Sequence, residues 1–388
     1  MKFFSAAALR RGVLIVHLWL GLIVGIYFSI IGVTGSVLVF SEELQRQQIM
    51  PERGYVAPPQ TGAQLMPLSQ VIGKLRSEFP DAPEAQLGFL HPPAHDGGAY
   101  LFRLTDDKKK TLVTSVNPYT GEVIKRYGTG RTWLDWVDDV HVNLLFADPG
   151  KLANGYGGLL AGLLVLSGLW LWWPRTIRQL KIRLSVKRSG GAGRIISDLH
   201  NVFGMYPFVL LLAVTLTGSV IVFYKPVQTV VFSLVGVARN PKTPRVVPVA
   251  GAQRLSIDKL MGIAVQTAPD AHFVFVQYPT KPSQAFYAYR RSETGILPDT
   301  RIYIDPYTGK LLQVGTEISD PTGRRIMRSA SGIHFGRWGS WPVKILYFFL
   351  GFIPLGLFVT GVLMYLRKRK AKSESLKRRN ARLGGNSS

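Results

Sequence analysis

The 388-residue sequence contains no cysteine, and this absence removes several kinds of redox and metal chemistry. Without cysteine there is no Cys-x-x-Cys-His attachment site for haem, no cysteine-ligated iron–sulfur cluster and no thiol relay. The sequence also lacks a Walker sequence, a His-Glu-x-x-His zinc motif and a glycine-rich loop between a strand and a helix. A flavin or nicotinamide electron donor would therefore belong to another protein.

Acidic residues are scarce, with 23 Asp and Glu against 47 Lys and Arg, which gives a net charge of +24. A nucleic-acid-binding protein can be this basic, but no nucleic-acid-binding motif is present. Instead, four long runs carry no charged residue: Gly12 to Phe40, Leu152 to Pro174, Leu199 to Tyr224 and Ile345 to Leu366. Each exceeds the roughly 20 helical residues that cross a hydrocarbon core of about 30 Å. We therefore predict a polytopic membrane protein with no nucleic-acid partner.

The basic residues predict the orientation of the chain in the membrane. They concentrate before the first apolar run, between the second and third, and after the fourth. Such segments stay in the cytoplasm and also contact anionic membrane lipid. The predicted organisation is a cytoplasmic N-terminus (1–12), spans at 13–40, 149–174, 195–224 and 343–366, periplasmic domains at 41–148 and 225–342, a basic cytoplasmic loop (175–194) and a basic cytoplasmic tail (367–388).

Both periplasmic segments have the pattern of a small α+β unit. In each, a stretch with helical periodicity precedes short alternating runs, such as "AYLFRL" in the first and "HFVFVQY" in the second. Each unit ends in a similar turn, Asn117 to Gly121 in the first and Asp305 to Gly309 in the second. Asn or Asp, then Pro, then a late Gly is typical of turns, so we assign these residues no catalytic role.

The matching turns are part of a longer internal similarity. Aligning His17 with His200 also places the Thr-Gly-Ser-Val sequence at 34–37 on the same sequence at 217–220. Aligning His141 with His334 also places Ser167-Gly168 on Thr360-Gly361. We predict a duplication in which both copies enter the membrane in the same direction, related by a pseudo-two-fold axis along the membrane normal.

This symmetry would bring four of the seven histidines together in two pairs. His17 and His200 would face each other near the cytoplasmic surface, and His141 and His334 near the outer surface. Two imidazoles that converge between helices form a ligand set for the iron of a b-type haem. Gly21 and Gly204 lie one helical turn from the inner pair and would leave room for a macrocycle. We expect two bis-histidine haems roughly 20 Å apart, given a core of about 30 Å.

The alternative for each histidine is an amphipathic residue at the membrane boundary, and a duplication would also copy such a residue. Trp133, Trp136, Trp338 and Trp341 flank the outer pair and are interpreted mainly as interfacial anchors. Asp135, Asp138 and Asp139 either attract a cationic ligand or solvate a loop, and we favour solvation. His91 and His95, in "LHPPAHDGG", have loop character, and surface histidines bind metal only occasionally.

The ordered motifs resemble the PepSY-associated transmembrane proteins over nearly the whole chain. They include "HLWLGLIVGIYFSIIGVTGSVLVFSEEL", "DLHNVFGMYPFVLLLAVTLTGSVIVF", the two "PYTG" turns and "SGLWLWWPR". The resemblance implies an α-helical four-span bundle with two periplasmic α+β PepSY-like domains. Within the family the architecture is most similar to the inner-membrane ferric-siderophore reductases, which pass electrons through two haems.

By this resemblance, His17, His200, His141 and His334 would be the axial ligands of two haem b groups. The substrate would be a ferric siderophore, with the hydroxamate type expected, and the electrons would come from an unidentified cytoplasmic donor. Reduction would loosen the chelate because its hard oxygen donors hold Fe(II) far more weakly than Fe(III). No siderophore-contacting or catalytic residue is assigned. A sensory or scaffolding protein that binds a periplasmic partner, and an iron or siderophore permease, remain as alternatives.

Overall fold

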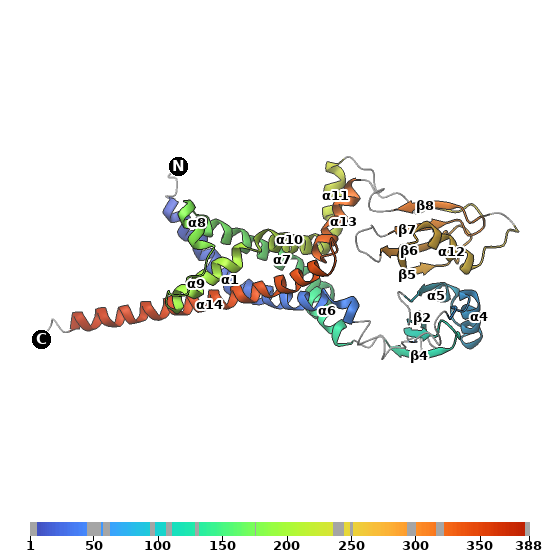
Figure 1. Cartoon of the computed structure of the whole chain (residues 1–388), viewed down its shortest axis with the longest axis horizontal. Coiled ribbons are helices and arrows are strands. Elements are labelled where there is room, and N and C mark those ends of the chain that lie inside the picture. The colour runs from blue at the N-terminus through green and yellow to red at the C-terminus, as the bar shows by residue number, and fades with distance from the viewer. Residues whose placement is uncertain are drawn as a thin grey trace.

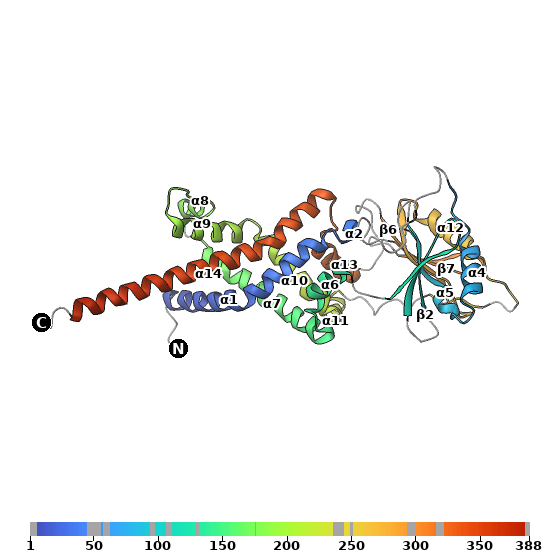
Figure 2. The ribbon, with the colours of Figure 1, turned by 90° about the horizontal axis from the view of Figure 1, so that it is seen from below.

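The computed structural model shows an elongated molecule, with a helical bundle at one end and a β-sheet at the other (Figure 1). The residues that the structure describes are 6–44, 56, 63–93, 98–105, 111–128, 132–174, 176–235, 244–248, 251–292, 300–315 and 322–384. Both ends of the chain lie at the end of the bundle away from the sheet (Figures 1 and 2). The helix in the basic loop, α8 (Ile177–Arg183), lies at that end too.

Three helices in the described residues are long and apolar enough to cross a membrane. They are α1 (Ala6–Leu38), α7 (Ala147–Trp172) and α14 (Trp341–Gly384). Helix α14 continues beyond the predicted fourth span into the basic tail. A fourth crossing is present only if α9 (Ala192–Met205) and α10 (Phe208–Val222) form one span, because the two helices are bent by 60°.

The bend differs from the single uninterrupted span predicted at 195–224. Pro207 lies between the two helices, where φ is −88° and ψ is 7°. Proline has no N–H to donate to the preceding turn, and its ring clashes with the carbonyl of the residue four positions earlier, which bends or breaks a helix. The 3.6-residue periodicity is not disturbed by one proline, so hydropathy alone does not reveal the break.

Close helix approaches hold the bundle together. At the crossing of α1 and α14, the Ser36 hydroxyl donates a hydrogen bond to the Phe348 carbonyl oxygen at 2.7 Å. At the crossing of α7 and α10, the Ser219 hydroxyl donates to the Gly155 carbonyl oxygen at 3.0 Å. Small residues allow such close contact between helices in a membrane, where the hydrophobic effect does not drive association.

Shorter helices surround the end of the bundle that faces the sheet: α2 (Ser41–Leu44), α6 (Trp133–Asn143), α11 (Tyr224–Leu234) and α13 (Thr322–His334). A reciprocal capping box starts α6. Thr132 accepts a hydrogen bond from the Asp135 backbone N–H, and the Asp135 side chain accepts one from the Thr132 backbone N–H. The predicted acidic loop is therefore a helix.

The two predicted periplasmic units share one antiparallel sheet of eight strands, in the order β4-β3-β2-β1-β5-β6-β7-β8. The first segment supplies β1 (Phe89–His91), β2 (Tyr100–Thr105), β3 (Thr111–Val116) and β4 (Val123–Gly128). The second supplies β5 (Ala271–Gln277), β6 (Phe286–Ser292), β7 (Thr300–Ile304) and β8 (Leu311–Gly315). The central β1–β5 pairing joins the halves, with Phe89 opposite Gln277.

Helices cover the face of the sheet that is turned away from the bundle (Figures 1 and 2). These helices are α4 (Leu68–Glu78), α5 (Glu84–Leu87) and α12 (Ile257–Thr267). Alternation places Phe286 and Ala288 of β6 in the core beneath them, both fully buried. Tyr287, Tyr289 and Arg291 alternate with these residues and therefore project from the opposite face.

The sequence correctly predicts the two turns. Asn117 Oδ1 accepts hydrogen bonds from the backbone N–H groups of Tyr119 and Thr120, and Asp305 Oδ1 accepts the equivalent pair in the second turn. Gly121 and Gly309 adopt φ values of 72° and 76°, a region that L residues with side chains rarely adopt.

Candidate functional site

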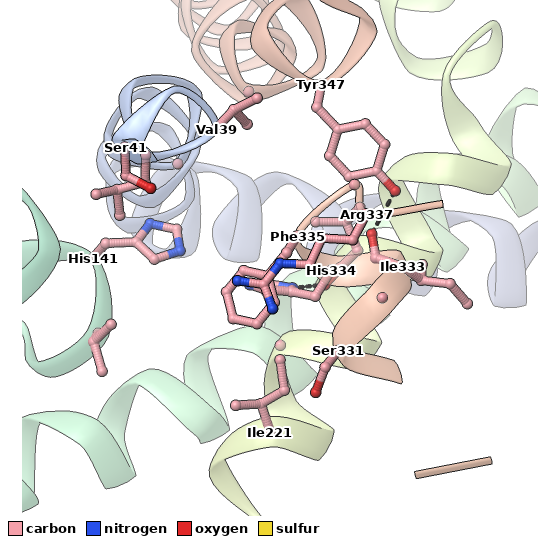
Figure 3. A pocket seen from close by; sticks show the side chains of 18 of the residues that line it. Val39, Ser41, His141, Ile221, Ser331, Ile333, His334, Phe335, Arg337 and Tyr347 are labelled. Carbon is pink, nitrogen blue, oxygen red and sulfur yellow. Dashed lines mark hydrogen bonds between the residues drawn. The ribbon is translucent and has the colours of Figure 1, made fainter. Parts of the chain in front are cut away.

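The structure brings the four predicted histidines together in two pairs. The ring centroids of His17 in α1 and His200 in α9 are 6.5 Å apart, with ring planes at 90°. Those of His141 in α6 and His334 in α13 are 6.2 Å apart, with ring planes at 45°. We call these the inner pair and the outer pair. Figure 3 shows the rings of the outer pair in the same cavity.

A side-chain hydroxyl lies beside Nδ1 of each inner histidine. His17 Nδ1 lies 2.8 Å from Ser167 Oγ, and that hydroxyl donates to the Leu164 carbonyl oxygen. His200 Nδ1 lies 2.9 Å from Thr360 Oγ1, whose hydroxyl donates to the Gly356 carbonyl oxygen. When the hydroxyl donates to its carbonyl, the histidine donates to the hydroxyl from Nδ1. The lone pair on Nε2 is then available to a ligand.

At the outer histidines, backbone carbonyl oxygens accept the hydrogen bonds from Nδ1. His141 Nδ1 lies 3.0 Å from the Ile31 carbonyl oxygen, and His334 Nδ1 lies 2.9 Å from that of Val214. A carbonyl only accepts, so both rings carry hydrogen on Nδ1. Burial lowers the pKa of His141 to about 4, with a further contribution from His334, and burial also lowers the pKa of His334. Both imidazoles are therefore neutral near pH 7, the form that binds metal.

A glycine lies against each of the four rings. A Cβ built on Gly35 would be 3.0 Å from His141 Cε1, and one on Gly218 would be 2.9 Å from His334 Cε1. At the inner pair the corresponding distances are 3.2 Å from Gly168 to His17 and 3.6 Å from Gly361 to His200. The glycines let each ring pack directly against a neighbouring helix backbone.

Sequence reasoning missed these neighbours. It predicts room for a macrocycle beside Gly21 and Gly204, where the nearest atoms to a Cβ would be those of the Leu164 and Leu357 side chains, at 3.8 and 3.7 Å. The informative signals were the repeated Thr-Gly-Ser-Val sequences and the Ser-Gly and Thr-Gly pairs. The sequence shows that these short segments are repeated, but it does not show that their glycines contact the histidines.

His91 lies in β1 rather than in a loop, and its Nδ1 donates to the Val274 carbonyl oxygen at 2.9 Å. Its role is therefore in the sheet, and His95 lies outside the residues that the structure describes. Within the described ranges, no cluster of three or more His, Asp or Glu side chains is arranged to hold a metal ion. A metal at either histidine pair would need its remaining ligands from a source other than those side chains.

The outer pair borders a cavity of about 1980 Å³ between the bundle and the sheet. Figure 3 shows His141 and His334 on opposite sides of this space, with Arg337 and Phe335 beside His334. The Tyr347 hydroxyl donates to the Ile333 carbonyl oxygen and accepts a hydrogen bond of 2.9 Å from the Trp338 indole. These contacts tie the segment after α13 to α14.

Residues 14–368 match the family described as the PepSY-associated TM region, which covers most of the 388 residues. No curated protein matches the chain.

Proposed function

Because the chain belongs to the PepSY-associated TM region family, we propose that it is a di-haem protein of the bacterial inner membrane that reduces a ferric siderophore in the periplasm. In this proposal the inner and outer histidine pairs each hold one haem b. Each haem would supply a one-electron carrier, with electrons entering from a cytoplasmic donor. The convergence of four histidines in two pairs is the observation that carries the proposal.

The ring separations fit bis-histidine ligation. Two metal–nitrogen bonds of about 2 Å, plus about 1.2 Å from each nitrogen to its ring centre, put collinear ligand rings about 6.4 Å apart. The measured separations are 6.5 and 6.2 Å. Two protein ligands per site also suit a macrocycle, which supplies the other four ligands itself.

The hydrogen bonds at Nδ1 support the same interpretation. A metal-binding histidine usually donates its other N–H to a carbonyl, carboxylate or similar acceptor, which fixes the tautomer and the ring orientation. All four histidines have such an acceptor. A buried histidine that binds no metal also needs an acceptor for its N–H, so this hydrogen bond alone does not identify a ligand. The pairing of rings that all carry this hydrogen bond is what favours ligation over simple packing.

The repeated contacts support the duplication as part of the proposal. The acceptors Ile31 and Val214 are equivalent in the alignment that places His17 on His200, and so are Gly35 and Gly218. Ser167 and Thr360, the partners of the inner pair, are equivalent in the alignment that places His141 on His334. Equivalent residues thus contact equivalent histidines, which is the arrangement that a pseudo-two-fold axis produces.

The two pairs contact α1 at positions 18 residues apart. His17 is in this helix, and Gly35, which touches His141, lies near its C-terminal end. At a rise of about 1.5 Å per residue, the stretch from His17 to Gly35 is about 27 Å long, a separation on the scale of the membrane core. The outer pair lies towards the sheet and the inner pair towards the termini, which supports a proposal with one haem near each membrane surface.

The test is a reoxidation experiment on the purified, haem-loaded protein. Chemically reduced protein should be reoxidised by a ferric siderophore, with Fe(II) appearing in a ferrous trap. The same siderophore loaded with Ga(III), which has equal charge and nearly equal size but is not reduced, should leave the haems reduced. Persistence of the reduced haems through a panel of ferric siderophores, together with rapid reoxidation by a quinone, would refute the siderophore assignment. Haem-free protein from haem-replete cells would favour the scaffold alternative.

A further inference from the structure

The turn that follows His141 has a strained backbone. Helix α6 ends at Asn143, and Leu144, Leu145 and Ala147 then adopt φ values of 51°, 64° and 49°. No other non-glycine residue in the described ranges has a positive φ. A positive φ crowds the Cβ of an L residue against the neighbouring backbone, so it persists only where surrounding contacts hold it. Contacts around this turn must therefore keep it in place.

The second copy makes the corresponding turn with a glycine. The alignment that places His141 on His334 also places Asn143 on Gly336, whose φ is 65°. Glycine reaches this region without a steric cost, because it has no Cβ. Within the described ranges, the strain thus belongs to the first copy, at the turn beside His141.

Asn154 in α7 holds the end of α6. Its Nδ2 donates hydrogen bonds to the carbonyl oxygens of His141 and Val142, at 2.7 and 3.0 Å. These carbonyls belong to the last turn of α6, where carbonyl groups lack partners within the helix. A carbonyl only accepts, so the NH2 end of the amide must face α6. Asn154 therefore ties α7 to the backbone of the outer histidine.

Tyr27 in α1 holds the other end of this amide. Its hydroxyl donates to Asn154 Oδ1 at 2.6 Å and lies 3.0 Å from the Asn154 backbone carbonyl oxygen. The Tyr27 ring packs against α7 at Gly157, where a Cβ would lie 2.5 Å from Tyr27 Cζ. A continuous chain of hydrogen bonds thus runs from α1 through α7 to the end of α6.

Three positions on one face of α1 act on His141. Tyr27, Ile31 and Gly35 are four residues apart, and residues with this spacing lie on the same side of a helix. Gly35 contacts the ring of His141, and the Ile31 carbonyl oxygen accepts the hydrogen bond from its Nδ1. Tyr27 reaches the backbone of His141 through Asn154. One face of α1 therefore places both the ring and the backbone of this histidine.

The second copy makes a comparable contact with different side chains. In the alignments given above, Tyr27 corresponds to Leu210 and Asn154 corresponds to Tyr347. The Tyr347 hydroxyl donates to the Ile333 carbonyl oxygen, in the last turn of α13. In both copies, a side chain from the next apolar helix thus caps the helix that carries an outer histidine. The contact recurs although the residues that make it differ.

We propose that Tyr27 and Asn154 are positioning residues, which hold the strained turn and thereby set the place of His141 in the outer pair. This inference rests on the proposed function and adds two residues to the outer site. A turn that relaxed from positive φ would move the end of α6, whereas ligand distances at a metal vary by only about 0.2 Å.

The test uses Tyr27→Phe and Asn154→Asp in the purified, haem-loaded, full-length protein. The first variant removes the hydroxyl, and the second keeps the shape of the side chain but removes its NH2 donor. We expect each to speed haem loss from the outer pair roughly tenfold, because residues that support a metal ligand are worth about 10–100-fold. Haem transfer to apomyoglobin measures the rate.

Tyr156→Phe is the matched control. It removes the same hydroxyl from a tyrosine of α7 that packs on Phe223 and makes no hydrogen bond through its hydroxyl in the described part of the chain. The rate of haem loss should not change in this variant.

Electron paramagnetic resonance identifies the haem that is affected. The ligand rings lie at 90° in the inner pair and 45° in the outer pair, and low-spin ferric haems with different angles give different signals. The outer signal should change in Tyr27→Phe and Asn154→Asp, while an unchanged inner signal shows that the bundle is folded. Adding Leu144→Gly to Asn154→Asp should restore the outer signal, because glycine adopts a positive φ without strain.

Several outcomes would overturn this inference. One is an unchanged outer haem in both variants, and another is equal loss of both haems, which would mean that the two residues only stabilise the bundle. A third is failure of Leu144→Gly to restore the signal, because His141 would then not be held through the turn. If the variants behave as expected but ferric siderophores do not reoxidise the reduced protein, the inference stands and the reductase proposal fails. If ferric siderophores reoxidise it and the variants keep the outer haem unchanged, only this inference fails.

Discussion

In the proposed di-haem protein, replacing Gly218 with alanine should remove the outer haem while leaving the inner one. The new Cβ would lie 2.9 Å from His334 Cε1, whereas carbon atoms in contact prefer about 3.5–4.0 Å. His334 or α10 would therefore have to move by about 0.6–1.1 Å. Ligand distances at metal sites vary by only about 0.2 Å, so the displacement is several times larger than the outer pair could absorb.

Gly361→Ala is the matched control, because it adds the same methyl group beside an inner histidine. Its Cβ would lie 3.6 Å from His200 Cε1, which is ordinary contact. Haem per chain, measured as the pyridine haemochrome of purified protein, should fall from about two to about one in Gly218→Ala and stay near two in Gly361→Ala. Equal haem content in both variants would refute the ligand geometry, and circular dichroism would identify a variant that simply fails to fold.

Three further predictions use other parts of the chain. His200→Ala should block reduction of the outer haem by a cytosolic donor. His334→Ala should leave the inner haem reducible but unable to reduce the chelate. Absorption spectroscopy measures the haem content, and full haem in both variants would show that the ligand assignment is wrong. Thr360→Val removes the acceptor 2.9 Å from His200 Nδ1 and should weaken haem binding at the inner pair about 10–100-fold, measured by haem transfer to apomyoglobin, and an unchanged transfer rate would count against that role. Burial lowers the pKa of His91, so the unfolded chain binds its proton more readily; the resulting stability is present above pH 6.5 and is lost as pH falls towards the folded pKa. His91→Gln should therefore lose less thermal stability than the natural protein between pH 7.5 and 5, and an equal loss in a thermal melt would exclude this contribution.

Hydropathy and repeats predict the apolar helices and the two turns, because these features depend on residues that are close together in the sequence. The sequence repeat also predicts the pairing of His17 with His200, because a pseudo-two-fold axis would place equivalent positions at equal depth, and the two rings do lie together. Local sequence could not predict the β1–β5 pairing, because three-residue β1 is too short to have a clear alternation pattern. Nor could it connect Gly218 with His334, because that contact depends on how α10 and α13 pack.

The β1–β5 pairing also constrains the order in which the molecule can be completed. Phe89 and Gln277 belong to different halves of the chain, and two of the apolar helical segments lie between them. Contacts between such distant residues form late, since the intervening chain must first be made and placed. Until then β1 has an open edge that can pair with another chain. A stalled or truncated chain that lacks β5 should therefore be prone to aggregation on the sheet side of the membrane, and a chaperone that protects this edge would act between synthesis of the two halves.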